Sequence, residues 1–289
     1  ATQSHFSQIF GLYPDPARTL DDRLAVVEMS EPALQGKTAD GVLHKLWPIT
    51  DIQTIADAAH ILQPSKIYIA DGHHRYETML ALRDELRGEH PDAGSEAPWE
   101  FATFFLCNMD DPGLIVLPTH RVVHSLPDLD LDKFLDQLKA WFSLTPVEAV
   151  RAHAALAEAP ADRAAFILAT GKQTLLVEQT APLAELPGLP ENPALRALDL
   201  TVLHNLILEH VLKITVEQQA AQTNLSYVKD AAEALLVALS DAAQIVFLVR
   251  PTPASAVRAV ADSGDVMPQK STFFYPKIAS GMVINPLVV

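Results

Sequence analysis

The sequence has a single cysteine, Cys107, among 289 residues, so no disulfide bond can form within the chain. It also lacks an uninterrupted apolar run of about 20 residues, the length that a membrane-spanning helix needs. No signal-peptide pattern is visible at its beginning. From these absences we expect a cytoplasmic protein that has no membrane segment and whose cysteine is an inert, buried residue.

Positively charged residues are scarce as well. The formal net charge is −15, because 21 Lys and Arg residues face 36 Asp and Glu residues. Nucleic-acid grooves and anionic membrane surfaces both favour basic patches on a protein. The charge therefore argues against nucleic acid and membrane as partners, and we expect a small-molecule metabolite instead. The composition does not indicate an oligomeric state.

The distribution of apolar residues predicts a mixed α/β protein. Hydrophobic residues make up 49% of the chain and charged residues 20%, which is typical of a folded protein. Patterns typical of strands and helices alternate in the first part of the chain, which favours an α/β sheet. We expect helices over residues 19–28, 52–62, 73–87, 131–142, 147–157, 195–211, 227–238 and 254–262. The predicted inward stripe of the second helix consists of Ile52, Ile55, Ala59 and Leu62.

Strands are predicted between these helices. They cover residues 6–13, 42–47, 67–70, 101–108, 114–117, 165–169, 174–178 and 245–249. The two strands that flank Gly171 and Lys172 are expected to pair as a hairpin. The expected architecture is a mixed sheet with flanking helices, divided into a first region, residues 1–125, and a second, residues 126–289.

One stretch, residues 66–80, carries the strongest functional signal. A short buried strand is predicted to end at a turn made by Asp71 and Gly72, and a helix is predicted to begin at His73. This order places backbone N–H groups and the positive end of a helix dipole at one point in space. Asp71, His73, His74 and Arg75 are four ionisable residues at that same point.

These residue types favour an anion site. The planar guanidinium of Arg75 suits phosphate, and the helix N-terminus supplies backbone donors. His73 or His74 could transfer a proton near neutral pH, and Asp71 could orient a histidine or hold a metal ion. The competing interpretation is structural: Asp71 caps the helix, and the imidazoles are solvated.

A metal-binding interpretation adds His120 or His124 to Asp71 and the two adjacent histidines. Adjacent helical side chains diverge by about 100°, so two neighbouring histidines rarely bind one ion. The sequence also lacks the spacings typical of zinc ligands. We therefore expect no dedicated metal site, and Mg²⁺ would arrive with a bound phosphate.

Two further segments could contribute ligands. His120 and Arg121 follow a predicted strand, and open α/β sheets often place ligands at strand ends; a surface turn is the alternative. In residues 264–277, Lys270, Ser271, Thr272 and Lys277 could hold an anionic group. That segment is not a P-loop, because Gln269 stands where the second glycine belongs. Its aromatic residues could equally plug a core.

Residues 69–78, 118–121 and 267–277 resemble three separate signatures of the domain of unknown function 1015 family. Residues 71–75 are similar to the phosphate-binding motif of the ParB/sulfiredoxin-like fold. The resemblance implies a ParB/sulfiredoxin-like core in the first region and an α/β portion in the second. It also implies that Gly72, His73, His74 and Arg75 bind a nucleotide or phosphate, with ATP or ADP and Mg²⁺ as cofactors.

The wider group includes kinases that phosphorylate free serine, so the resemblance implies phosphoryl transfer to a small metabolite such as serine. Sulfinic-acid repair is not expected, because Gly72 and His73 occupy the position of the sulfiredoxin cysteine. Known family members extend further upstream, so we expect the N-terminal part of the family to be absent here. Two alternatives stay open: a nucleotide sensor without turnover, and a metal-dependent hydrolase.

Overall fold

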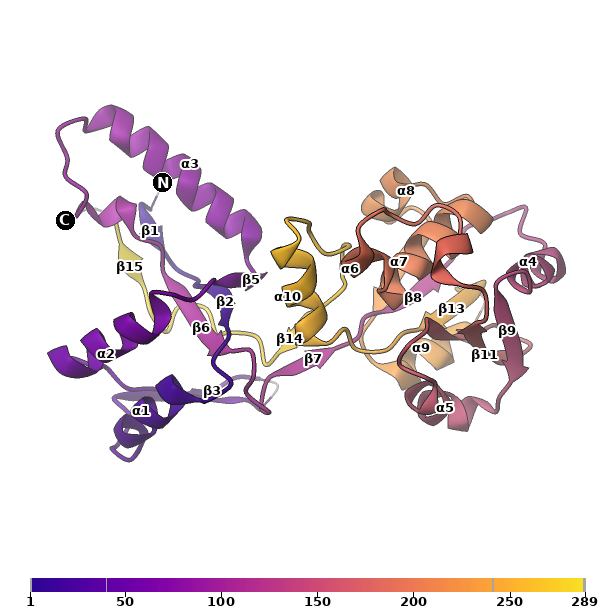
Figure 1. The fold of residues 1–289 in the computed structure, drawn as a ribbon, viewed down its shortest axis with the longest axis horizontal. Coiled ribbons are helices and arrows are strands. Elements are labelled where there is room, and N and C mark those ends of the chain that lie inside the picture. The colour runs from indigo at the N-terminus through magenta and orange to yellow at the C-terminus, as the bar shows by residue number, and fades with distance from the viewer. Residues whose placement is uncertain (1, 40, 241, 288–289) are drawn as a thin grey trace. The chain divides into compact units, whose positions relative to one another are not determined.

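The computed structural model of the chain describes residues 2–39, 41–240 and 242–287 (Figure 1). The chain forms two compact units: unit 1 is Ala1–Ile115 with Phe274–Val289, and unit 2 is Val116–Phe273. Helices and strands alternate in both, which confirms the mixed α/β class. The expected division into residues 1–125 and 126–289 stays a prediction. No helix in the described residues combines the length and apolar character of a membrane span.

Unit 1 is built on a mixed three-stranded sheet in the order β5-β2-β6. The central strand β2 (Ile9–Tyr13) is buried along its whole length. It pairs antiparallel with β5 (Tyr68–Asp71) and parallel with β6 (Phe104–Asn108). The other elements of this unit are α1 (Thr19–Glu28), α2 (Ile52–Leu62), α3 (His73–Glu89), the 3₁₀ turn η1 (Pro98–Glu100), the hairpin β3 (Leu34–Lys37) and β4 (Leu43–Leu46), and the pair β1 (Ser4–His5) and β15 (Asn285–Pro286).

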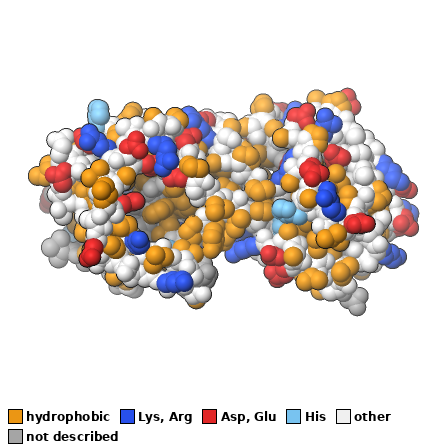
Figure 2. All heavy atoms as spheres, turned by 90° about the horizontal axis from the view of Figure 1, so that it is seen from below, with side chains coloured by type: hydrophobic (Ala, Val, Ile, Leu, Met, Phe, Trp, Pro, Cys, Tyr) orange, Lys and Arg blue, Asp and Glu red, His pale blue; other side chains and the backbone are white. Residues whose placement is uncertain are grey.

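Helix α2 has the predicted bounds but not the predicted inward face. Its start is fixed locally, because the Asp51 carboxylate accepts a hydrogen bond from the Thr54 N–H at 2.8 Å. Ile52 is 82% exposed, however, and α2 has no buried residue. The half-buried face instead includes Asp57, Ala58 and Ile61, and the Asp57 carboxylate pairs with Arg23 of α1 at 3.1 Å. Figure 2 accordingly shows apolar side chains among charged ones on the surface of unit 1.

Unit 2 contains an antiparallel sheet of six strands in the order β12-β8-β13-β10-β11-β9. The strands are β8 (His120–Val123), β9 (Phe142–Pro146), β10 (Ala165–Ala169), β11 (Thr174–Gln179), β12 (Leu225–Val228) and β13 (Ile245–Leu248). The chain enters this unit through β7 (Ile115–Leu117) and leaves it through β14 (Phe273–Tyr275). The predicted hairpin is confirmed as β10 and β11, with Ala165 opposite Glu178.

The sheet of unit 2 has an apolar cluster on each face, which is why its central strands are apolar at every position. Along β10, Phe166 and Leu168 join the cluster that includes Phe134 and Leu203, whereas Ile167 joins the opposite cluster. The other elements of unit 2 are α4 (Leu131–Leu138), η2 (Ala149–Arg151), α5 (Ala152–Glu158), η3 (Leu183–Glu185), α6 (Pro193–Arg196), α7 (Asp199–Thr201), a π-helix labelled η4 (Val202–Val211), α8 (Val216–Ala221), α9 (Ala231–Ala238) and α10 (Ala254–Asp262).

Several predictions in this unit are wrong. The helix expected over residues 131–142 ends at Leu138, because Phe142 already belongs to strand β9. The helix expected from residue 227 begins only at Ala231, after Asp230 accepts the capping bond, because Tyr227 belongs to strand β12. The alternative for residues 118–121 is a surface turn, but His120 and Arg121 begin strand β8, whose residues 120–123 are all buried. The helix expected over residues 195–211 is divided into three pieces, the last of which has π-helical hydrogen bonding.

We expect the substitution Gly11→Ala to destabilise unit 1 by about 1–3 kcal/mol, the usual effect of overpacking a core. A Cβ at Gly11 would lie 2.7 Å from the Ile67 side chain and 2.9 Å from that of Leu106. Gly36→Ala is the matched control, because nothing lies within 4 Å of its Cβ position. Urea unfolding of both variants checks the difference, and equal midpoints would contradict the packing of β2.

Candidate functional site

Helix α3 begins where the sequence predicts, at the end of strand β5. The turn residue Gly72 has φ +91°, a left-handed conformation that glycine adopts without strain. No side chain caps this helix. The first-turn N–H groups and the positive end of the helix dipole therefore remain available to an anion.

The guanidinium of Arg75 folds back over this turn. It donates hydrogen bonds to Asp71 Oδ2 at 3.1 Å, to Ser7 Oγ and to the carbonyl oxygen of Gln8. A Cβ on Gly72 would lie 2.6 Å from Arg75 Nη2. Glycine is thus required here for the backbone conformation and for the position of the guanidinium, which ties α3 to the segment that precedes β2.

Asp71 also pairs with a second cation. Lys277 Nζ lies 3.4 Å from Asp71 Oδ1, so this carboxylate is shared between Lys277 and Arg75. The three side chains are between 34% and 44% exposed, so a ligand can reach them from solvent. The structure therefore brings together residues from two of the predicted segments, 71–75 and 267–277.

The two histidines of α3 lie at the open side of the same turn. His73 and His74 are exposed, and their ring centroids are 4.0 Å apart. His74 Nδ1 also lies 3.3 Å from the Glu77 carboxylate. Within the described residues, no three His, Cys, Asp or Glu side chains are grouped so that they could hold a metal ion. Both histidine rings are therefore accessible to solvent beside the turn.

The predicted residues of β8 have a different setting within unit 2. His120 is buried, and its Nδ1 accepts a hydrogen bond from the Val249 N–H at 3.2 Å. Arg121 has no exposed surface. Its guanidinium donates to the carbonyl oxygens of Thr119 and Lys270 and to His204 Nε2. Arg121 therefore supports the 267–272 loop through main-chain atoms.

The rest of this loop is partly engaged in its own structure. Lys270 has an exposed side chain and a left-handed φ of +55°. Ser271 is buried, and its hydroxyl donates to the carbonyl oxygen of Pro268. The Thr252 hydroxyl donates to the Ser271 carbonyl at 3.1 Å, whereas Thr272 is half-buried. Lys270 and Thr272 are thus the loop side chains that a ligand could reach.

Burial and a neighbouring charge depress two histidine pKa values in unit 2. Burial chiefly, and then Arg121, lower the pKa of His204 from 6.5 to about 3. The same two causes, in the same order, lower the pKa of His120 to about 4. The hydrogen bonds agree with neutral rings, because His204 Nε2 must be unprotonated to accept from Arg121. Its Nδ1–H then donates to Gln219 Oε1 at 2.7 Å.

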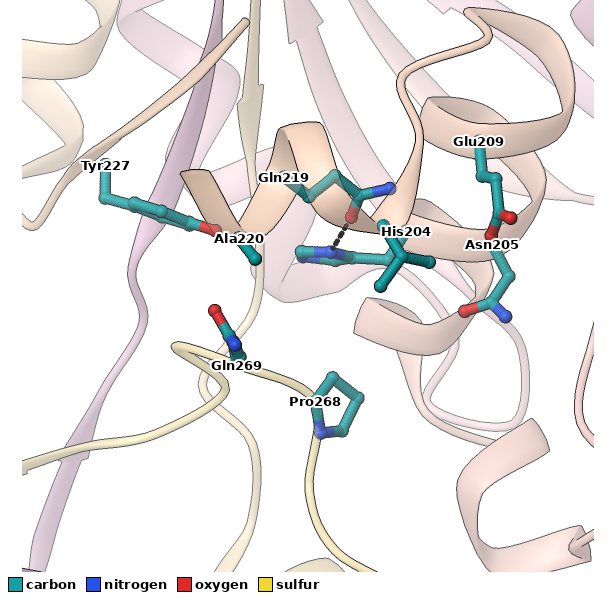
Figure 3. Close-up of a pocket in the computed structure, with 9 residues that line it drawn as sticks. His204, Asn205, Glu209, Gln219, Ala220, Tyr227, Pro268 and Gln269 are labelled. Atoms are coloured by element: carbon teal, nitrogen blue, oxygen red, sulfur yellow. Dashed lines mark hydrogen bonds between the residues drawn. The ribbon is translucent and has the colours of Figure 1, made fainter. Parts of the chain in front are cut away.

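Sequence reasoning missed several residues around these sites. Ser7 and Gln8 lie near the start of the strand predicted over residues 6–13, and no local signal links them to Arg75. Tyr227 was assigned to a helix, although it lines a pocket of unit 2 together with His204 and Gln219 (Figure 3). The aromatic and apolar alternation of residues 225–228 was the available signal for a strand there.

We expect the stability of unit 2 to fall as the pH is lowered from 6.5 to 5. Unfolded histidines bind protons in this range, whereas folded His204 and His120 do not, so acid favours the unfolded state. Each histidine should remove up to about 1.4 kcal/mol per pH unit from the free energy of unfolding. Urea unfolding at several pH values measures the slope.

The variant His204→Gln should have a smaller slope, because the unfolded chain then lacks one histidine that binds a proton in this pH range. His60→Gln, at an exposed position on α2, is the matched control and should leave the slope unchanged. An identical slope in His204→Gln and in the unmodified chain would contradict the depressed pKa of His204.

Comparison with known proteins gives a family match and remote structural likenesses. The family described as "Protein of unknown function (DUF1015)" matches residues 1–201. No curated protein matches the chain. A conserved hypothetical protein from Pyrococcus furiosus is 18% identical, with 94% of this chain and 89% of that chain covered and a TM-score of 0.42.

Structures of a free serine kinase are also similar at a remote level. The complex with AMP is 14% identical, with 93% of this chain and 83% of that chain covered and a TM-score of 0.39. A variant of that kinase in complex with ADP is 14% identical, with 92% of this chain and 83% of that chain covered and a TM-score of 0.38. Likenesses this remote carry no argument about activity. The family match covers residues 1–201 of 289, well over half of the chain, and the protein therefore belongs to the DUF1015 family.

Proposed function

We propose that the first turn of α3 binds the phosphate groups of a nucleotide, ATP or ADP. The observation that carries this proposal is the uncapped helix N-terminus beside two cations, Arg75 and Lys277, that share one carboxylate. Helix N-termini favour anions through backbone donors and through the dipole. The resemblance of residues 71–75 to a ParB/sulfiredoxin-like phosphate-binding motif supports the same assignment.

In this proposal Asp71 holds the two cations in place until the ligand arrives. Pairs that are this exposed are worth only about 0–1 kcal/mol, so a phosphate with several negative charges can compete for them. Arg75 would then present its planar fork, and Lys277 a point charge, to phosphate oxygens. Gly72 leaves room for the Arg75 guanidinium beside the first turn of the helix. The other predicted ligands have no part in this proposed site because they lie in unit 2, and they stay predictions: His120, Arg121, Lys270, Ser271 and Thr272.

We further propose that the bound ATP donates its γ-phosphoryl group to a hydroxyl of a small metabolite, with free serine as the candidate. The hydroxyl oxygen forms a bond to the γ-phosphorus while the bond to the ADP oxygen breaks. The hydroxyl proton passes to His73, His74 or Asp71. Such chemistry depends mainly on positioning and on charge stabilisation. Mg²⁺ would neutralise charge between the phosphates and be held mostly by their oxygens.

The first test is a thermal-shift screen with ATP, ADP, CTP, GTP, pyrophosphate and phosphoserine, with and without Mg²⁺. A ligand at about 100 times its Kd should add about 2.7 kcal/mol to the free energy of unfolding. We expect Arg75→Ala to weaken binding of the active ligand at least tenfold, about 1.4 kcal/mol, because charge-assisted hydrogen bonds are lost. Calorimetric titration measures the two affinities.

Two further variants keep this test decisive if Arg75→Ala unfolds. Lys277→Ala should weaken binding without removing the tie to Ser7. Arg83→Ala, in the same helix but paired with Asp84 at 2.8 Å, is the matched control and should bind as the unmodified chain does. The proposed phosphate site would be overturned if all variants bound the nucleotide with equal affinity, or if no ligand raised the melting temperature. Release of ADP with serine present separates phosphoryl transfer from binding alone.

A further inference from the structure

The pocket lined by His204 and Tyr227 is a cavity whose lining lies wholly within unit 2, beside the π-helix η4. Its volume is about 170 Å³, and its lining includes His204, Asn205, Glu209, Tyr227 and Gln269 (Figure 3). Drug-sized ligands occupy sites of about 300–1,000 Å³, so this cavity is too small for a nucleotide. It has room for several water molecules or for a small metabolite.

The backbone around the cavity is unusual. Three lining residues, His204, Asn205 and Glu209, come from a π-helical stretch of ten residues, Val202–Val211. Each hydrogen-bonded turn of a π-helix closes between residues i and i+5, so His204 and Glu209 lie one turn apart. π-Helical segments are rare in proteins, and those that occur are often found at functional sites. The cavity therefore coincides with a rare backbone conformation.

One end of the cavity adjoins a buried positive charge. Arg121 contacts three lining residues: its Nε donates to His204 at 3.1 Å, its Nη2 lies 3.4 Å from the Gln269 carbonyl, and its guanidinium carbon is 5.5 Å from the centre of the Tyr227 ring. Arg121 has no carboxylate partner in the described part of the chain. A buried charge without a counterion is costly, and an anionic group nearby offsets that cost.

Two polar groups at the cavity have no bonding role within the described chain. The Tyr227 hydroxyl makes no hydrogen bond there, and in Figure 3 it points toward Gln269 and Ala220 at one end. The half-buried Glu209 carboxylate forms no ion pair among the described residues, and it lies at the opposite end of the view, beyond His204. The Tyr227 hydroxyl, near the buried Arg121, thus lies at one end of the cavity, and the unpaired Glu209 carboxylate lies at the other.

We propose that this cavity binds a small zwitterion whose carboxylate and ammonium groups are several bonds apart. The ligand carboxylate accepts a hydrogen bond from the Tyr227 hydroxyl and compensates the charge of Arg121 behind it. The ligand ammonium pairs with the Glu209 carboxylate, and its methylene groups lie against the apolar part of the lining, which includes Val216 and Pro268. The site is separate from the α3 turn and does not depend on the proposed phosphate binding.

Calorimetric titration with β-alanine, γ-aminobutyrate and 5-aminopentanoate tests the proposal, because these probes differ only in the spacing of their charges. We expect at least one to bind with a Kd below 10 mM. For the γ-aminobutyrate spacing, butyrate lacks the ammonium and butylamine lacks the carboxylate, and each should bind at least tenfold more weakly. No binding by any of the three zwitterions would overturn the proposal, and so would equal binding by butyrate.

Variants assign the two ends of the ligand. Tyr227→Phe removes only the hydroxyl, and Glu209→Gln removes only the charge; each should weaken the best zwitterion at least tenfold. Glu148→Gln, at an exposed position of unit 2, is the matched control and should bind normally. Arg75→Ala should also bind normally, which separates this site from the α3 turn. Unchanged affinity in both Tyr227→Phe and Glu209→Gln would overturn the assignment.

Discussion

The backbone at Gly72 is the constraint on which the α3 site depends. A φ of +91° redirects the chain from β5 into α3, and the missing side chain leaves room for the Arg75 guanidinium, which lies 2.6 Å from the Cβ position. Any other residue would be strained at this φ and would displace the guanidinium. The same absence leaves the first-turn N–H groups open. One residue therefore sets the helix start, the position of the cation and the access for an anion.

Unit 2 depends on the charge of Arg121, which is buried, whereas the charge of Arg75 in unit 1 is partly exposed. Arg121 is fully buried, and neutral acceptors take its hydrogen bonds: carbonyl oxygens of the 267–272 loop and Nε2 of His204. This arrangement fixes the His204 tautomer, lowers the pKa of that ring and holds the loop beside the π-helix. Removing the charge would therefore affect the loop, the histidine and the adjacent cavity together.

The charged residues at α3 and those around Arg121 suit different kinds of ligand, because they differ in exposure and in pairing. At α3 the charges are exposed and weakly paired with Asp71, so a highly charged ligand can replace the existing pairs at little cost. In unit 2 the cation is immobile and desolvated, so a ligand of one negative charge gains most by approaching it without displacing its partners. Exposure and pairing, more than residue type, distinguish the two sites.

Local sequence determined the elements whose signals lie close together in the chain. The bounds of α1, α2 and α10, the β10–β11 hairpin and the turn before α3 follow from the Asp51 cap of α2, from proline and turn residues, and from short apolar runs. The tertiary structure decided the rest. It brought Lys277 to Asp71 and Ser7 to Arg75, exposed Ile52, and buried β8. The physical reason is that capping and turn geometry act over a few residues, whereas burial and ion pairing depend on which distant segments pack against each residue.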